Sequence, residues 1–410
     1  MTLDRSTSYR RFNAPLPTQS TAAPSPPSLS ADARALIPSE YRPPCRANER
    51  VLRWKPAVPS PRLTESLPTD LVTSDAEFER ILDVYAGSWR ESTKSVYGSG
   101  LLIYHLFCDR EKVPEERRCP ASAILLSKFI TTCAGSYSGS CLDNYVAAIA
   151  AWHRLHGFPW LLPADQQAGI LEGARRLAPE KSTRPKRAPF TVDDILRIHS
   201  VLDPTNSCDA AVYACLVVSF YCVARLGEFT VPSTDAFKAN PRSYISRRDV
   251  AEVVDRNGLK ATRFHIPKTK TSPVAGADTQ CASQSDATDP ITALNNHLRV
   301  NAAPTDAHLF AWHHPKRGIV ALSKWQFLRR LSAAADTLQI PLAKGHGIRI
   351  GGTLEYLLRG VPFEAVKAMG RWAGDSFTVY LRKHAVILAP YLQDSPVLDP
   401  FTRYTLPPAA

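Results

Sequence analysis

The sequence lacks any apolar run long enough to cross a membrane. Its longest such run, from Ala211 to Ala224, is well short of the roughly 20 residues that a spanning helix needs. The N-terminus also lacks the apolar block of a signal peptide. We therefore expect a soluble protein that is not secreted and has no membrane partner.

The nine cysteines lack the spacing of a metal or redox site, because no two of them form a Cys-x-x-Cys pair. Cys208, Cys215 and Cys222 lie seven residues apart, which places them on one face of a helix as small apolar residues. Unpaired cysteines are typical of a reducing compartment. We expect an intracellular protein, located in the nucleus if the host is eukaryotic.

Motifs of the common cofactor sites are also missing. The chain has no Gly-x-x-x-x-Gly-Lys-Ser/Thr loop for nucleotide triphosphates, no His-Glu-x-x-His, no Gly-x-Ser-x-Gly turn and no EF-hand loop. We therefore expect chemistry without a metal ion, ATP or another cofactor.

Positive charge is what the sequence has in excess. Fifty Lys and Arg against 38 Asp and Glu give a net charge of +12, which favours an anionic partner such as nucleic acid or an acidic membrane face. With 410 residues, 44% hydrophobic and 21% charged, the chain has the composition of a globular protein of two to three domains. Charge alone does not choose between the two partners.

Composition and periodicity divide the first half of the chain in two. Residues 1–73 hold 12 of the 34 prolines, and this composition predicts a disordered arm that cannot bury enough apolar surface to fold. Residues 74–178 form an all-α domain, with helices predicted over 75–86, 92–109, 121–134, 139–156 and 163–177.

Residues 179–189 form a basic, proline-punctuated linker that contains Arg184, Lys186 and Arg187. Such a segment can be a solvated connection between domains, which is its ordinary role. It can also cross a phosphate backbone or serve as a nuclear import signal.

The second domain, over residues 190–395, mixes helices with strands and is followed by a tail over 396–410. Asn257-Gly258 lies between two β-prone runs within 245–267 and predicts a hairpin. Residues 271–288 are predicted to be a loop. The expected helices are 208–224, 290–301, 323–337, 346–359, 362–369 and 376–388. The fold class predicted for the whole chain is mainly α with a small antiparallel β-sheet.

Three short segments of this domain carry cationic residues in apolar helical sequence. Arg225 ends the most apolar helix and needs an anion, either Glu228 or a bound ligand. His346 and Arg349 are three residues apart, so both can reach one oxyanion from a single helix face. Glycines are costly inside a helix, and several lie around these two residues, so we expect another group to approach this helix closely. They are Gly345, Gly347, Gly351 and Gly352.

The third segment runs from Met369 to Arg382. Gly370 is expected to end one helix, which leaves Trp372 in a turn and Tyr380 one turn into the next helix. Taken alone, each of the three segments has a structural explanation: an ion pair, a surface pair and a core tyrosine.

In this order, however, the segments resemble the catalytic residues of the tyrosine recombinases, the phage-integrase family. The sequence around these residues looks closer to the recombinases of DIRS and Crypton mobile elements, and to related fungal proteins, than to bacterial resolvases. The resemblance covers residues 88–384, about 70% of the chain, and is most specific in 224–230 and 345–384. It implies an all-α, SAM-like core-binding domain followed by an α+β catalytic domain.

The resemblance assigns a role to each matched residue. Arg225 and Arg349 match the two family arginines, Glu228 the acid beside the first, and His346 the histidine. Trp372 stands where the family has His or Trp, and Tyr380 matches the nucleophile. Tyr380 lies eight positions after Trp372, one fewer than in many members.

The family's general-acid lysine lies in the loop after a β-hairpin. Lys270, followed by Thr271, best matches the Lys-Thr sequence that is usual at this position of the family, and Lys268 is the alternative for the general acid. Tyr391 is a distant rival for the nucleophile.

The resemblance implies cleavage and rejoining of double-stranded DNA through a 3′-phosphotyrosyl intermediate, used for site-specific recombination or integration of a mobile element. Family members act as a clamp around the duplex, with four protomers on two sites. The linker residues Arg184, Lys186 and Arg187, together with Lys268 in the loop after the hairpin, would bind DNA. The alternative is a domesticated DNA-binding protein that keeps the fold but no longer recombines. A nicking-closing enzyme of topoisomerase type is a third hypothesis.

Overall fold

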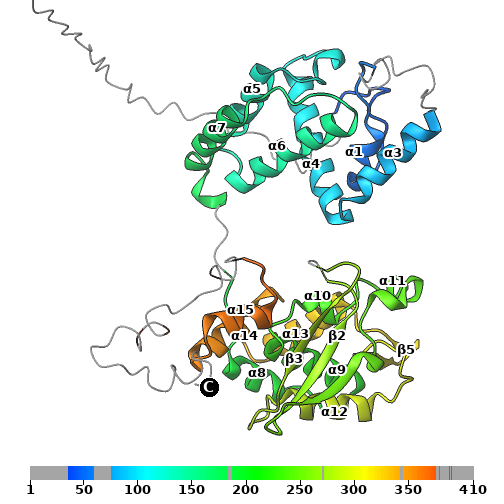
Figure 1. The fold of residues 1–410 in the computed structure, drawn as a ribbon, viewed down its shortest axis with the longest axis vertical. Coiled ribbons are helices and arrows are strands. Elements are labelled where there is room, and N and C mark those ends of the chain that lie inside the picture. The colour runs from blue at the N-terminus through cyan, green and yellow to red at the C-terminus, as the bar shows by residue number, and fades with distance from the viewer. Residues whose placement is uncertain are drawn as a thin grey trace, which may run out of the picture. The chain divides into compact units, whose positions relative to one another are not determined.

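The computed structural model describes residues 36–59, 75–182, 187–269, 272–341 and 345–374, together with 378, 387 and 389. The chain divides between Pro185 and Lys186 into two compact units, each with its own hydrophobic core (Figure 1). None of the described helices combines the length and the apolar character that a membrane span requires.

The first unit is built from helices alone over its described residues. They are α1 (Arg50–Arg53), α3 (Asp75–Gly87), α4 (Glu91–Arg110), α5 (Ala123–Cys133), α6 (Gly139–Leu155) and α7 (Ala164–Arg176), with short 3-10 turns at Ala47–Glu49, Glu115–Arg117 and Glu180–Ser182. The predicted helices of this unit agree with α3 to α7 to within two residues at each end. Tyr104 of α4, Phe129 of α5 and Trp152 of α6 are fully buried in its core.

Residues 36–59 correct the prediction of a disordered arm over 1–73. Trp54 is only 3% exposed, and its carbonyl oxygen accepts a hydrogen bond from Nε1 of Trp152 at 2.7 Å. The buried guanidinium of Arg42 binds Asp109 at 3.1 Å and Glu115 at 2.7 Å. The few anchoring side chains were hidden by the prolines when composition was averaged over 73 residues. Residues 1–35 and 60–73 lie outside the described part of the chain.

Among the described residues, the second unit contains most of the helices and both β-sheets. Its helices are α8 (Val192–His199), α9 (Ser207–Tyr221), α10 (Leu226–Phe229), α11 (Thr234–Ala239), α12 (Pro290–Val300), α13 (Lys324–Thr337), α14 (His346–Leu358) and α15 (Phe363–Gly370). Its strands are β1 (Val250–Val254), β2 (Lys260–Ile266), β3 (Ala277–Cys281), β4 (Trp312–His314) and β5 (Gly318–Val320). Helix α9 is buried from Asp209 to Tyr221, as expected of a helix that is apolar all round.

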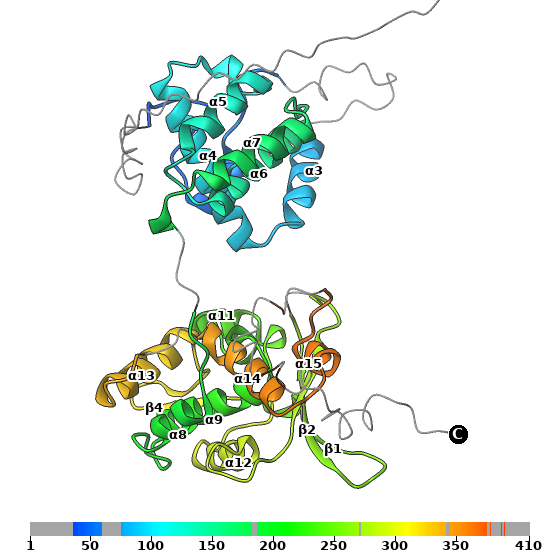
Figure 2. The same ribbon diagram turned by 90° about the vertical axis from the view of Figure 1, so that its left-hand side faces the viewer.

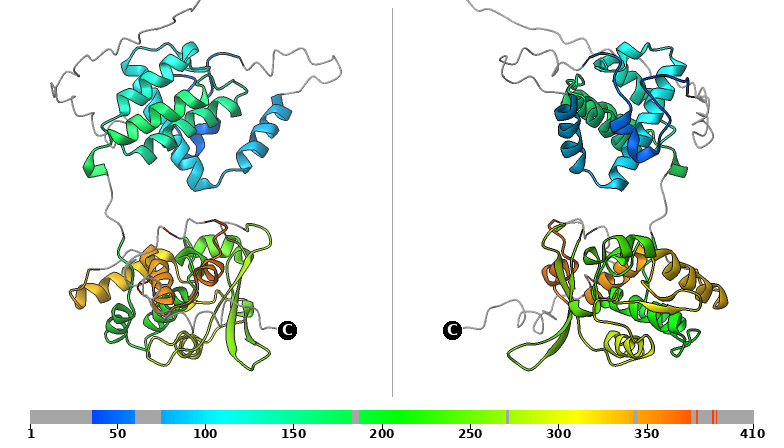
Figure 3. Two further views of the ribbon diagram at one scale, coloured as in Figure 1. Left: turned by 60° about the vertical axis from the view of Figure 1, so that its left-hand side comes forward. Right: turned by 90° about the vertical axis from the view of Figure 1, so that its right-hand side faces the viewer.

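The predicted hairpin is confirmed. Strands β1 and β2 pair antiparallel, with Val254 opposite Lys260, so the loop between them has five residues. Gly258 has φ +78°, which glycine adopts without strain. The carboxylate of Asp255 accepts hydrogen bonds from the backbone N–H groups of Asn257 and Leu259, both at 2.8 Å. The hairpin projects from the unit on the side opposite α13 (Figures 2 and 3).

Two features of the β-structure were not predicted. Strand β3 lies in the segment that was expected to be a loop, and it pairs antiparallel with β2 to make the order β1-β2-β3. Thr279 and Cys281 are buried while Asp278 and Gln280 are exposed, a pattern too short to recognise in a polar sequence. The pair β4–β5 was also missed. The fold class itself, mainly α with a small antiparallel sheet, is confirmed.

Candidate active site

Helix α14, which carries His346 and Arg349, is packed closely against the chain on two sides. A Cβ atom on Gly351 would lie 2.1 Å from the carbonyl oxygen of Phe190, and one on Gly352 would lie 2.1 Å from that of Phe220. The close approach predicted from these glycines is therefore made by the protein's own backbone. Contacts this short leave no room for a side chain, so the glycines fix how deeply α14 lies in the core.

Arg349 is buried, with 1% of the residue exposed. Its Nη1 donates to the carbonyl oxygen of Val223 at 3.0 Å and its Nη2 to that of Gly370 at 2.6 Å. Its guanidinium carbon lies 4.1 Å from the centre of the Trp372 ring. The segment that follows α9 and the turn that follows α15 therefore hold this guanidinium in one orientation.

Arg225 lies at the N-cap of α10 and pairs with Glu228, as the structural reading of its sequence predicted. Its Nη1 donates to Oε1 of Glu228 at 3.1 Å, and its backbone N–H donates to Oε2 at 2.9 Å. The Glu228 side chain is 6% exposed, whereas the Arg225 side chain is 30% exposed. Arg225 can therefore meet a ligand from solvent while remaining bound to the buried carboxylate.

His346 is the first residue of α14 and is half-buried. Burial lowers the pKa of its imidazole, and neighbouring cations lower the pKa further; in order of effect they are Arg187, Arg349, Arg225 and Lys324. The imidazole is therefore neutral at pH 7, the form that accepts a proton. These four cations also make the surroundings of His346 strongly electropositive.

We expected a glycine, Gly370, to end the helix α15, but the residue with the left-handed conformation there is a different one. Gly370 is the last helical residue, and Arg371 takes the left-handed conformation instead, with φ 57° and ψ 45°. The Trp372 ring covers Gly370 so closely that a Cβ atom there would lie 1.7 Å from a ring carbon. Glycine is needed at 370 for this contact.

The structure thus brings together five of the predicted site residues, which are Arg225, Glu228, His346, Arg349 and Trp372. Arg187 adds its charge at His346. Lys268 is exposed in the loop after β2, and none of the ion pairs formed by the described residues joins it to this cluster. The predicted Lys270, Tyr380, Arg184, Lys186 and the rival Tyr391 lie outside the described residues, as does most of the predicted helix 376–388.

Sequence reasoning missed two residues of this cluster. Arg371 donates from Nη2 to Oε2 of Glu228 at 2.6 Å, although 143 positions separate them. Lys324 begins α13, where no motif surrounds it, and its charge acts on His346. The position of Arg371 between Gly370 and Trp372 could have indicated that it lies near the site. Nothing in the sequence, however, indicates that it binds Glu228.

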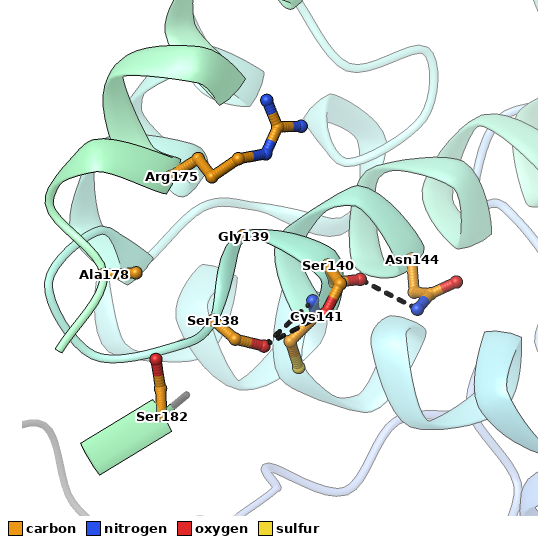
Figure 4. Close-up of a pocket in the computed structure, with 8 residues that line it drawn as sticks. All are labelled: Ser138, Gly139, Ser140, Cys141, Asn144, Arg175, Ala178 and Ser182. Atoms are coloured by element: carbon orange, nitrogen blue, oxygen red, sulfur yellow. Dashed lines mark hydrogen bonds between the residues drawn. The ribbon is translucent and has the colours of Figure 1, made fainter. Parts of the chain in front are cut away.

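A cavity of about 590 Å³ in the first unit shares no residue with this cluster (Figure 4). It is lined by Ser138, Gly139, Ser140, Cys141, Asn144, Arg175, Ala178 and Ser182. The Ser138 hydroxyl accepts from the backbone N–H of Cys141 at 3.3 Å, and Asn144 donates to the Ser140 carbonyl at 2.8 Å. Arg175 is bound to Glu172 and Asp143. Ser138, Asn144 and Arg175 therefore already have bonding partners within the first unit.

No family model and no curated protein sequence matches this chain. Among solved structures, it is similar to XerH site-specific recombinase bound to a palindromic difH substrate, at 13% identity over 78% of this chain and 85% of that one, with a TM-score of 0.48. A lambda integrase dimer bound to a COC′ core site matches at 13% identity over 75% and 95%, with a TM-score of 0.42. An FLP recombinase–Holliday junction complex matches at 11% identity over 69% and 78%, with a TM-score of 0.32. None of these three neighbours is more than 13% identical to this chain.

Proposed function

We propose that this protein is a tyrosine recombinase that cleaves and rejoins double-stranded DNA through a 3′-phosphotyrosyl intermediate, without metal or ATP. The observation that carries the proposal is the meeting of Arg225 and Arg349 beside a neutral His346. Arg225 lies at the N-cap of α10, whereas His346 and Arg349 lie in the first turn of α14, and the cations around His346 include both arginines. A site with this excess of positive charge fits an anion, and the residue order fits the recombinase family.

The chemistry follows from the charges. Attack on a phosphodiester adds negative charge to the oxygens around phosphorus, and guanidinium groups stabilise it through hydrogen bonds that persist at any working pH. His346 would take the phenolic proton of Tyr380, whose oxygen forms a bond to phosphorus. The bond from phosphorus to the 5′ oxygen breaks, and Lys270 or Lys268 gives that oxygen a proton. An ester replaces an ester of similar energy, so the reverse reaction can join a second strand without ATP.

The partner of this reaction would be double-stranded DNA, bound by four protomers on two sites, and the biological role would be recombination or integration of a mobile element. The basic residues Arg187 and Lys268 are both exposed and available for phosphate contacts. Arg184 and Lys186, in the same linker as Arg187, would add to this grip. Binding of this kind depends mainly on charge and weakens as salt rises.

The test is a search for a covalent protein–DNA adduct on nicked suicide DNA and on supercoiled DNA, including the sequences that flank the gene. Wild type should give an adduct that survives denaturation. Tyr380→Phe should give none because it lacks the attacking oxygen, while Tyr391→Phe, the matched control, should retain it.

An adduct that survives Tyr380→Phe would contradict the assignment of the nucleophile. If wild type binds these DNAs but forms no adduct on any of them, the protein is a recombination-inactive DNA-binding protein instead. Separate Lys268→Ala and Lys270→Ala variants should slow cleavage sharply at one position only, which identifies the general acid.

A further inference from the structure

Arg371 is an unusual residue for the place that it occupies. It lies at the C-terminal end of α15 with positive φ, a conformation that costs a non-glycine residue about 1 kcal/mol or more. Its side chain is 13% exposed, and its Nε and Nη1 are buried with no hydrogen-bond partner among the described residues. A buried guanidinium in a strained turn requires a compensating interaction.

That interaction is the bond to Glu228. Oε2 of Glu228 accepts from Nη2 of Arg371 at 2.6 Å and from the backbone N–H of Arg225 at 2.9 Å. Oε1 accepts from Nη1 of Arg225 at 3.1 Å. One carboxylate is thus shared by two guanidinium groups, and the three side chains together carry one net positive charge.

The same turn also holds the other arginine of the site. The carbonyl oxygen of Gly370 accepts from Nη2 of Arg349, and the Trp372 ring packs on its guanidinium. Three consecutive residues, 370–372, therefore contact Arg349 directly and Arg225 through Glu228. A shift of this turn would move both guanidinium groups.

We propose that Arg371 is a positioning residue for Arg225, which rests on the proposed function. By binding Oε2, Arg371 leaves Arg225 with a single side-chain bond to Glu228, so the other donors of the Arg225 guanidinium are free to meet a phosphate. Without Arg371, Arg225 can form a two-pronged pair with the carboxylate, the preferred geometry of such pairs. The guanidinium would then turn away from the phosphate.

The first test compares single-turnover cleavage of suicide DNA by wild type and variants. Arg371→Ala and Glu228→Gln should each slow cleavage about 30-fold, equal to about 2 kcal/mol at 1.36 kcal/mol per tenfold, with little change in DNA affinity. The double variant should be no slower than Glu228→Gln, because both changes break one connection. Arg371→Lys, which keeps the charge, should recover part of the rate.

Arg330→Ala is the matched control, since Arg330 also binds a buried carboxylate, that of Asp209, at 2.6 Å in the same unit. It should lower stability without slowing cleavage by folded protein. Rate losses that multiply in the double variant would overturn the proposal, because Arg371 would then act independently of Glu228.

A second measurement separates this proposal from the proposed function. In protein labelled with 15N-arginine, the Nε–H signal of Arg225, identified from its loss in Arg225→Lys, should shift in Arg371→Ala but not in Arg330→Ala. This result is independent of cleavage, so it holds even if wild type forms no adduct. An unchanged Arg225 signal in Arg371→Ala would overturn the positioning role.

Discussion

The two central arginines of the second unit are held by different kinds of partner. Nη1 and Nη2 of Arg349 donate to backbone carbonyl oxygens, so the backbone fixes the orientation of its guanidinium. Arg225 is held by a carboxylate that also binds Arg371. Because two guanidinium groups share one carboxylate, Arg225, Glu228 and Arg371 together keep one net positive charge, which could stabilise the anion of the proposed reaction.

Buried histidines give the first unit a different property, a loss of stability in acid. His153 accepts a hydrogen bond at Nε2 from the backbone N–H of Ala121, at 2.9 Å, and its Nδ1 lies 2.8 Å from the Ile149 carbonyl oxygen. Burial lowers its pKa to about 4. Since its pKa in the unfolded chain is about 6.5, the unfolded state binds the proton first. Its stabilising contribution is present above pH 6.5 and is lost as the pH falls toward 4.

We expect the unfolding free energy of the first unit to fall by about 2 kcal/mol per buried histidine of this kind between pH 7 and pH 5. His153→Gln, which cannot be protonated there, should reduce that fall by the same amount even if it lowers stability at pH 7. Urea titrations followed through the amide signals of α6 at the two pH values measure the difference. A pH dependence equal to that of wild type would show that His153 is not the group responsible.

At the scale of elements, α14 is placed by contacts that a single methyl group would destroy. We expect Gly351→Ala to destabilise the second unit by about 2 kcal/mol or more, because its Cβ atom would press on the backbone carbonyl of Phe190. Gly173→Ala is the matched control: Gly173 lies within α7 with open space around it, and alanine should stabilise that helix by about 0.5–1 kcal/mol. Thermal unfolding of both variants tests the contrast, and a stabilising Gly351→Ala would contradict the packing described.

Elements that are determined by neighbouring residues were predictable from the sequence, and elements that depend on partners distant in the sequence were not. Asn257-Gly258 identified its hairpin because a turn is determined by adjacent residues. Strand β3 was missed because its polar sequence forms a strand only through pairing with β2. Trp54 and Arg42 were missed in a proline-rich segment because their partners lie on α4, α6 and the turn at Glu115.

The candidate site divides in the same way. The order of Arg225, His346 and Arg349 could be recognised because each lies in a distinctive short segment. The sharing of Glu228 by Arg371 could not, since nothing in either segment refers to the other. A family resemblance supplies the identities of matched residues, whereas ion pairs that are specific to this chain emerge only from the folded structure.

At the scale of the whole molecule, the effect of the net charge of +12 depends on where the cations lie and on which of them are paired with acids. Several cations of the second unit, Arg187, Arg225, Lys324 and Arg349, act on one imidazole. Several cations of the first unit are paired with acids, such as Arg42 with Asp109 and Arg176 with Glu172. Cations paired with acids contribute little to binding a polyanion, so exposed cations outside such pairs, such as Arg187, should dominate the proposed affinity for DNA.

Arg187 offers a direct test of this division. If it contacts a DNA phosphate, Arg187→Ala should weaken binding to any duplex sequence and reduce the slope of log K against log salt by about 0.9, the value for one phosphate contact. Arg176→Ala, which removes an exposed cation already bound to Glu172, is the matched control and should leave the slope unchanged. Fluorescence anisotropy with labelled duplexes between about 50 and 200 mM salt gives both slopes. Equal slopes for wild type and Arg187→Ala would mean that the charge of Arg187 acts within the protein, on His346, and not on DNA.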